Sequence, residues 1–240
     1  MPPEAFSPFE ELLDRIRREG FMRWADVEEE FLRAVEAFDR EYSRGGRTSG
    51  WYQSKARYFN DVIVDLLKNA SRRDITVRTK KRSKLFDKID IDICFPTDGE
   101  PLIAGEVKIL GTPAHPGNAD RPRRASADLH KRSREVAFTS LDLKAAYTGP
   151  ASIASFQAWV DTTSPGYFCF WALRIADDRD LERVRTIVTR LRNYCNGVGA
   201  FAYRPKSGTG VTGYEILRLP ESVDHALEEM AQRIRSQPAS

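Results

Sequence analysis

The stretch KIDIDICF at residues 88–95, followed by LIAGEVKIL at residues 102–110, decides the fold of this chain. The first stretch alternates strictly, which predicts a strand with Ile89, Ile91, Ile93 and Phe95 on one face and Lys88, Asp90, Asp92 and Cys94 on the other. The intervening segment PTDGEP has turn chemistry. The two stretches therefore predict a hairpin of paired strands.

Charged side chains gather on one face of this hairpin. In the second strand Glu106 and Lys108 share a face, because side chains alternate with a period of two, while Val107 and Ile109 point the opposite way. Carboxylates that crowd together repel one another unless a cation lies between them, and oxygen-only ligands favour a hard ion such as Mg²⁺. A lysine beside that ion could orient a water molecule or neutralise developing charge, which is the equipment for phosphodiester hydrolysis.

The rest of the chain predicts an α/β fold, a mixed β-sheet flanked by helices. Helical spacing of apolar residues continues over long segments, and residues 167–175 are apolar almost throughout, as in a strand buried on both faces. The expected helices are residues 51–68, 126–146, 179–195 and 222–235, and the further expected strands are residues 74–78, 198–203 and 214–219.

Two more helices precede this core and read as an N-terminal helical appendage. The second of them is expected to run from Trp24 to Tyr42. The predicted division is residues 1–48 for the appendage and 49–240 for the main domain. The appendage is expected to pack on the core, with a dimer contact as the alternative.

Composition excludes several classes of protein. The chain has 240 residues with 41% hydrophobic and 30% charged residues, and its longest apolar runs are too short for a membrane span. Three cysteines without a C-x-x-C pair argue against a disulfide framework and a structural zinc site. The N-terminal segment lacks the pattern of a secretory signal, so a cytoplasmic location is expected. The net charge of +3 is too small to indicate a polyanionic partner by itself.

The hairpin resembles the bipartite signature of the PD-(D/E)XK nuclease superfamily, which includes many type II restriction endonucleases. The resemblance lies in the D-x-D strand at residues 88–95 and the E-x-K motif at residues 106–108, and it covers roughly residues 51–203 in the order helix, hairpin, helix and buried strand. It implies a restriction-endonuclease-like core that binds Mg²⁺. No proline precedes either aspartate, which departs from the name-giving motif.

The resemblance also assigns roles to residues. Asp92 and Glu106 would bind the metal and Lys108 would assist the attacking water, with Asp90 as the neighbour of Asp92 or its substitute. An acidic residue on the preceding helix often approaches the metal in this family, and Asp61 and Asp65 are the candidates.

Basic residues flank the hairpin on both sides and are candidates for contacts with DNA phosphates. Alone, each group reads equally well as solvated surface. The predicted DNA-binding residues are Arg57, Lys80, Lys81, Arg82, Arg121, Arg123, Arg124, Lys131 and Arg134, with Gln53, Lys55, Arg78, Lys84 and Arg132 as further candidates. Arginines of the long loop at residues 111–125 are expected to read base edges.

The expected function is thus a Mg²⁺-dependent, sequence-specific endonuclease acting on double-stranded DNA, a homodimer with no membrane association. A cognate DNA methyltransferase that acts separately is a further candidate partner. The alternatives are a repair, recombination or defence nuclease of the same fold, and a catalytically inactive DNA-binding module. A purely structural interpretation is also open: the charges of the hairpin would form surface ion pairs that contribute little to stability.

Overall fold

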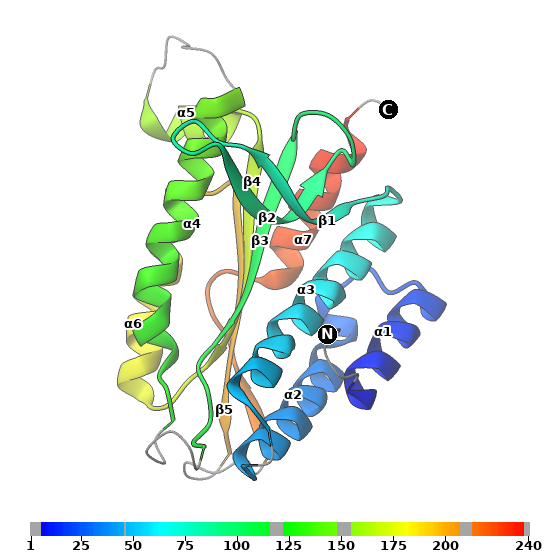
Figure 1. Ribbon diagram of the computed structural model, residues 1–240, viewed down its shortest axis with the longest axis vertical. Coiled ribbons are helices and arrows are strands. Elements are labelled where there is room, and N and C mark those ends of the chain that lie inside the picture. The colour runs from blue at the N-terminus through cyan, green and yellow to red at the C-terminus, as the bar shows by residue number, and fades with distance from the viewer. Residues whose placement is uncertain (1–5, 46, 116–121, 148–154, 207–212, 238–240) are drawn as a thin grey trace.

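One mixed sheet of six strands, in the order β1-β2-β3-β4-β5-β6, carries helices on both of its faces (Figure 1). The computed structural model describes residues 6–45, 47–115, 122–147, 155–206 and 213–237. The helices are α1 (Ser7–Glu19), η1 (Trp24–Asp26), α2 (Glu28–Ser43), α3 (Ser49–Ser71), α4 (Ala125–Tyr147), α5 (Phe156–Thr162), α6 (Asp178–Leu191) and α7 (Val223–Arg235). The strands are β1 (Thr76–Arg82), β2 (Lys88–Phe95), β3 (Ile103–Leu110), β4 (Gly166–Arg174), β5 (Gly197–Pro205) and β6 (Tyr214–Leu217).

The connections explain why the sheet is mixed. Strands β1, β2 and β3 form an antiparallel meander, whereas β3, β4 and β5 run parallel and β6 returns antiparallel to β5. Parallel neighbours need crossover connections, and here α4 and α5 join β3 to β4 while α6 joins β4 to β5. The predicted α/β class with a mixed sheet flanked by helices is confirmed.

Strand β4 lies between two hydrophobic layers, and every one of its residues is buried. Phe168 and Phe170 belong to the layer under α1, α2, α3 and α7, whereas Tyr167 and Trp171 belong to the layer under α4 and α6. A strand covered on both faces has no polar positions, which is why this segment is apolar almost throughout.

The N-terminal helices pack on the core, as expected, with α1 against α2 and α3. Phe31 of α2 is fully buried, and its ring centroid lies 5.3 Å from that of Phe59 in α3 and 6.0 Å from that of Phe201 in β5. The apolar stripes of α1 and α2 therefore join the same core as residues from the main domain.

The isoleucines of β2 do not all face the same side of the sheet, contrary to the alternating pattern. Ile93 and Phe95 pack in the layer under α3 and α7, but Ile91 belongs to the opposite layer and Ile89 packs against that same layer. The neighbouring strand has Arg78 in the left-handed region with φ of 53°, level with Asp92 in the β1–β2 register. The hairpin therefore twists at this level, and strict alternation along the whole of β2 is wrong.

Two local differences from the sequence analysis concern helices. The predicted helix from Trp24 begins as a short 3₁₀ turn, and α2 proper starts at Glu28. Helix α5 was not expected; it is a short helix with Ser155 as its N-cap, whose hydroxyl accepts from the Ala158 N–H at 3.1 Å. Within the described ranges, no helix is long and apolar enough to cross a membrane.

Candidate active site

Asp92, Glu106 and Lys108 meet in space, and we call them the carboxylate–lysine cluster. The ammonium nitrogen of Lys108 lies 2.8 Å from Oε1 of Glu106 and 3.2 Å from Oδ2 of Asp92. All three side chains are partly accessible, with exposed fractions of 29% for Asp92, 16% for Glu106 and 28% for Lys108. The structure thus brings together the three residues that the hairpin motif singles out.

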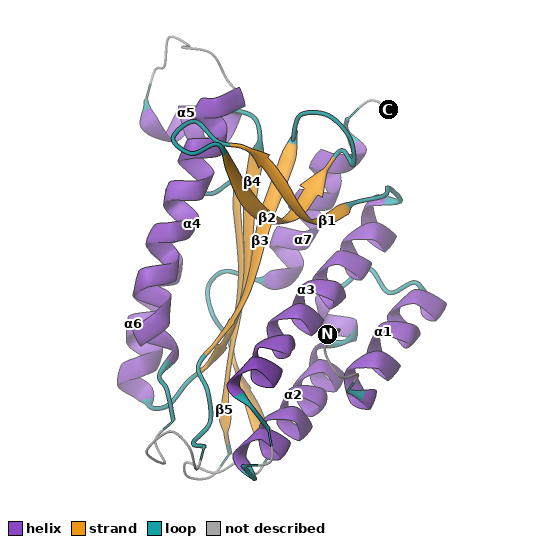
Figure 2. Cartoon of the chain, viewed as in Figure 1, coloured by secondary structure: helices purple, strands orange, loops and turns teal. Residues whose placement is uncertain are grey.

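The cluster lies where β2 leaves β3. Pairing between these strands ends at Ile93 and Gly105, and one step further the carboxylate of Asp92 accepts a hydrogen bond of 3.0 Å from the backbone N–H of Val107. From Glu106 onward β3 pairs with β4 alone, so its other edge is free of strand partners. Figure 2 shows the lower part of β3 continuing beyond the β1–β2 ribbon. Asp92 therefore caps the first N–H of an open strand edge.

The charges in the cluster stabilise the ammonium form of Lys108. Burial lowers the pKa of Lys108, but the carboxylates of Glu106 and Asp92 raise it by more, so this pKa lies above its ordinary value. Lys108 is consequently a cation at neutral pH and cannot serve as a general base in this state. It can neutralise the two carboxylates or the negative charge of a phosphate.

Tyr167 forms a hydrogen bond to the cluster, and the sequence did not predict this contact. Its hydroxyl donates a hydrogen bond of 3.1 Å to Oε2 of Glu106, and the side chain is 1% exposed. Burial and the nearby charge of Glu106 raise the pKa of Tyr167 well above its ordinary value, so the hydroxyl keeps its proton. Tyr167 stands at the start of β4, 61 residues from Glu106, and an apolar strand gives no sign of such a contact.

A hollow of about 400 Å³ opens beside the cluster, and we call it the α3–α4 hollow. Its lining includes Gln53 of α3, Lys108 of β3, Thr112 just beyond that strand, and Asp128 and Arg132 of α4. Figure 2 shows these two helices on either side of the lower part of β3. Gln53 and Arg132, both candidates for contacts with nucleic acid, thus share a concave surface with Lys108.

The remaining predicted carboxylates lie outside the cluster. Asp90 is 83% exposed, and its nearest cation is Lys80 at 3.9 Å. Asp61 accepts a hydrogen bond of 2.9 Å from Arg78, and Asp65 accepts one of 2.8 Å from Arg17. Burial raises the pKa of both Asp61 and Asp65, and the arginine partners only partly offset this effect. In this structure Asp61 and Asp65 are ion-pair partners of arginines.

The cluster fits a hard cation held by few protein ligands. Across the described part of the chain, no three carboxylate, histidine or cysteine groups converge closely enough to form a metal cage. Mg²⁺ commonly binds through one or two carboxylates together with water and substrate phosphate, and does not need such a cage. Asp92 and Glu106, at the open edge of β3, match that donor set.

The first basic group lies on the β1–β2 hairpin. Lys81 donates to the carbonyl of Gly99 at 2.9 Å, and Arg82 donates to the carbonyl of Ala146 at 2.8 Å. Arg57 sits on α3, 3.8 Å from Asp61. The side chains of Lys80 and Arg82 are 69% and 61% exposed, so their charges are accessible to a phosphate.

The second basic group divides between two places. Arg123 pairs with Asp128, which lines the α3–α4 hollow. Arg124 instead lies 2.7 Å from Asp177 at the start of α6, and Arg134 lines a groove between α4 and α6. Lys131 is 76% exposed and 3.9 Å from Glu135. Arg121 lies outside the described residues.

Lys55 was a candidate for contacts with DNA, and this prediction is wrong because the side chain is buried. Its side chain is 1% exposed, and its ammonium group donates to Asp39 at 2.7 Å. Asp39 also accepts from Tyr52 at 3.0 Å and from Tyr214 at 2.7 Å. This buried network lies behind the α3–α4 hollow, which Tyr52 also lines.

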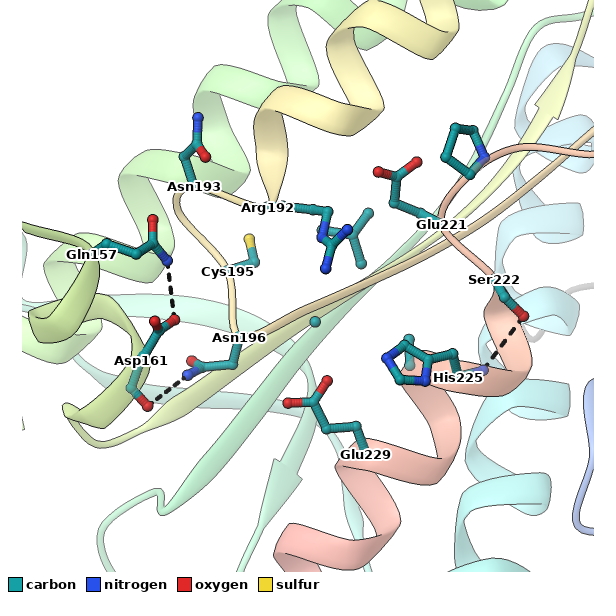
Figure 3. Close-up of a pocket in the computed structure, with 14 residues that line it drawn as sticks. Gln157, Asp161, Arg192, Asn193, Cys195, Asn196, Glu221, Ser222, His225 and Glu229 are labelled. Atoms are coloured by element: carbon teal, nitrogen blue, oxygen red, sulfur yellow. Dashed lines mark hydrogen bonds between the residues drawn. The ribbon is translucent and has the colours of Figure 1, made fainter.

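A larger hollow of about 590 Å³ lies elsewhere, between α5, the α6–β5 connection and the start of α7 (Figure 3). Its lining includes Asp161, Cys195, Glu221, His225 and Glu229 but none of the predicted site residues. Its carboxylates share the lining with Arg192 and His225 but not with a lysine. The carboxylate–lysine cluster is therefore the better candidate for phosphodiester chemistry.

The chain shows no significant match to any protein-family model, curated protein or solved structure.

Proposed function

We propose that this protein is a Mg²⁺-dependent endonuclease that hydrolyses phosphodiester bonds of double-stranded DNA. The observation that carries the proposal is the meeting of Asp92, Glu106 and Lys108 at the point where β2 leaves β3. The order α3, β1 to β3, α4 and β4 supports it, because it agrees with the order that the resemblance to the PD-(D/E)XK superfamily implies.

Asp92 and Glu106 would hold the metal ion. Asp92 uses one oxygen, Oδ2, for both Val107 and Lys108. The backbone carbonyl oxygen of Val107 would be a third ligand of the metal. The N–H and C=O of a strand residue point to the same side, and the N–H of Val107 points to Asp92. Tyr167 would keep the carboxylate of Glu106 in a fixed orientation. When bound, Mg²⁺ polarises the phosphate and lowers the pKa of a coordinated water molecule.

Lys108 would act through its charge. Its raised pKa keeps it protonated near neutral pH, and its side chain lines the α3–α4 hollow, where a phosphate would approach. An ammonium group placed there stabilises the negative charge that develops on the phosphate in the transition state. Gln53 and Arg132 would hold the DNA backbone on either side.

The finer points of the proposal are a restriction-type preference for a specific sequence, a homodimer and a cytoplasmic location. A two-fold dimer would match the symmetry of a palindromic site. The arginines near the end of the long loop that follows β3 are the proposed readers of base edges, with Arg123 next to the hollow through its partner Asp128.

The test is incubation of purified protein with unmethylated plasmid DNA in Mg²⁺ or in EDTA. We expect Mg²⁺-dependent cleavage, reduced by about 100-fold or more in Lys108→Ala, because loss of one preorganised charge commonly costs that much. Lys68→Ala, in the last turn of α3, is the matched control and should cut like the wild type.

The pattern of products separates the alternatives. Discrete bands would indicate a sequence-specific enzyme, and a smear would indicate a repair or degradative nuclease. DNA that stays intact but is bound equally well in Mg²⁺ and EDTA would indicate an inactive DNA-binding module and overturn the proposal.

A further inference from the structure

The turn between β1 and β2, residues 83–87, presents apolar side chains to solvent, and we call it the hairpin tip. Leu85 is 67% exposed and Phe86 is 58% exposed. Phe138 of α4 is 44% exposed, and its ring centroid lies 6.0 Å from that of Phe86. Within the described part of the chain, these are three of the six large apolar side chains that are exposed. Such a concentration marks an interaction surface.

The hairpin tip is held in one conformation. The buried carboxylate of Asp142 in α4 accepts from the backbone N–H groups of Lys84 and Leu85, both at 2.9 Å, and from the hydroxyl of Ser83. That hydroxyl in turn accepts from the N–H of Phe86 at 2.8 Å. The backbone conformation that exposes Leu85 and Phe86 is therefore built by specific contacts, and the backbone of the tip loses little further freedom on binding.

The base of the hairpin tip is also fixed to α4. The hydroxyl of Tyr147 accepts a hydrogen bond of 3.0 Å from the backbone N–H of Arg82. The guanidinium of Arg82 lies 5.0 Å from the centre of the Tyr147 ring. Figure 1 shows the turn between β1 and β2 over the upper end of α4.

The surroundings of the hairpin tip are basic. The segment of residues 78–90 carries six lysines and arginines against two aspartates, and one of these, Asp90, already faces Lys80. Lys84 and Lys88, which lie on either side of Leu85 and Phe86 in the sequence, are exposed. An excess of positive charge in the segment that carries exposed apolar side chains suits a partner with a polyanionic backbone and flat apolar groups, and nucleic acid has both.

We propose that Leu85 and Phe86 form a wedge that inserts between, or stacks on, the bases of DNA. This inference rests on the proposed function, since the DNA is the one that the cluster would cut. Apolar side chains that enter a base step unstack it and kink the duplex. The flanking lysines would hold the phosphates at that step.

The position of the wedge predicts where the distortion occurs. Phe86 precedes Asp92 by six residues, a span of at most roughly 20 Å because part of it lies in the turn before β2. At about 3.4 Å per base pair, that upper limit corresponds to roughly six base pairs. The unstacked step should thus lie within about half a helical turn of the cleaved bond.

The test is permanganate oxidation of thymines in an AT-rich duplex bound in EDTA, where cleavage does not interfere. We expect one or two hyperreactive thymine steps with the wild type. These should disappear with the double variant Leu85→Ser and Phe86→Ser, with DNA binding weakened by about fivefold to 100-fold, as for lost base stacking. Phe156→Ser, a similarly exposed phenylalanine on α5, is the matched control and should behave like the wild type.

Asp142→Ala provides a second variant that keeps both apolar side chains. Loss of its hydrogen bonds should loosen the hairpin tip and weaken the thymine reactivity without abolishing it. Unchanged reactivity and affinity in the double variant would overturn the wedge. So would a double variant that binds and distorts DNA normally but loses self-association in sedimentation velocity, because the tip would then be a contact between protein copies.

Parallel assays in Mg²⁺ separate this inference from the proposed function. DNA that is cut by the wild type without hyperreactive thymines would overturn the wedge and leave the nuclease proposal standing. DNA that is distorted but never cut would support the wedge and overturn the nuclease proposal.

Discussion

Lys108 and Glu106 stand two residues apart on β3, and the ammonium nitrogen of Lys108 lies 2.8 Å from Oε1 of Glu106. The same nitrogen lies 3.2 Å from Oδ2 of Asp92. The lysine therefore supplies, in this structure, the positive charge that would otherwise have to come from a metal ion between the two carboxylates. Lysine and metal would therefore compete for the same two carboxylates.

Lys108→Met should bind a divalent cation more tightly than the wild type in the absence of DNA. Removing the competing ammonium leaves two carboxylates that repel each other unless a cation joins them, and a gain of about fivefold or more is in the usual range of coupling between sites. Isothermal titration with Mg²⁺ or Ca²⁺ measures it, with Lys68→Met as the control. Equal affinities of wild type and variant would contradict the competition.

Tyr167→Phe should weaken metal binding while leaving the fold intact. The variant removes the hydrogen bond that orients Glu106, and loss of such a supporting contact typically lowers metal affinity by about tenfold or more. The cost in unfolding free energy should be only about 1 kcal/mol. Cation titration and urea denaturation measure the two effects. Tyr194→Phe, outside the cluster, should change neither, and an equal effect of both variants would remove the role assigned to Tyr167.

The buried side chain of Lys144 should make the stability of the fold depend on pH. Its side chain is fully buried and donates to the carbonyls of Thr163 and Pro165, both at 2.8 Å, yet burial lowers the pKa of Lys144 to about 8 from its ordinary 10.5. Between these values the unfolded chain binds more protons than the folded one, so stability should rise with pH.

Urea denaturation of the wild type and of Lys144→Met measures this effect, because the difference between them cancels the other titrating groups. The stability of the wild type relative to the variant should increase from pH 8 to pH 10, by at most about 1.4 kcal/mol per pH unit. A difference that stays constant or falls over this range would show that the hydrogen bonds hold the ammonium form against burial.

Asp39→Ala should be among the more destabilising single substitutions in this chain. It would leave the ammonium of Lys55 buried without its carboxylate partner, which commonly costs about 3–5 kcal/mol. Glu182→Ala, which breaks an exposed pair with Arg185, is the control and should cost no more than about 1 kcal/mol. Chemical denaturation compares them, and similar values for both would mean that Lys55 sheds its charge or reaches water.

Local pattern predicted the residues of the cluster but not all of its surroundings. A period of two places Glu106 and Lys108 on one face of a strand, and a short turn brings Asp92 opposite, so neighbours along a hairpin can be read from the sequence. The same rule failed for Ile89 and Ile91, because the hairpin twists at the level of Arg78 and the strand changes the layer it packs against.

The sequence by itself determined the α/β class, most of the strands and helices, and the meeting of Asp92, Glu106 and Lys108, because each depends on side-chain period and short connections. Only the tertiary structure decided the hydrogen bond from Tyr167 to Glu106, the burial of Lys55 on Asp39 and the exposure of Leu85 and Phe86 at a fixed tip. The first and third involve residues more than fifty positions apart, and the second joins two helices across a loop. The identity of such neighbours depends on how the layers pack, and no local pattern encodes it.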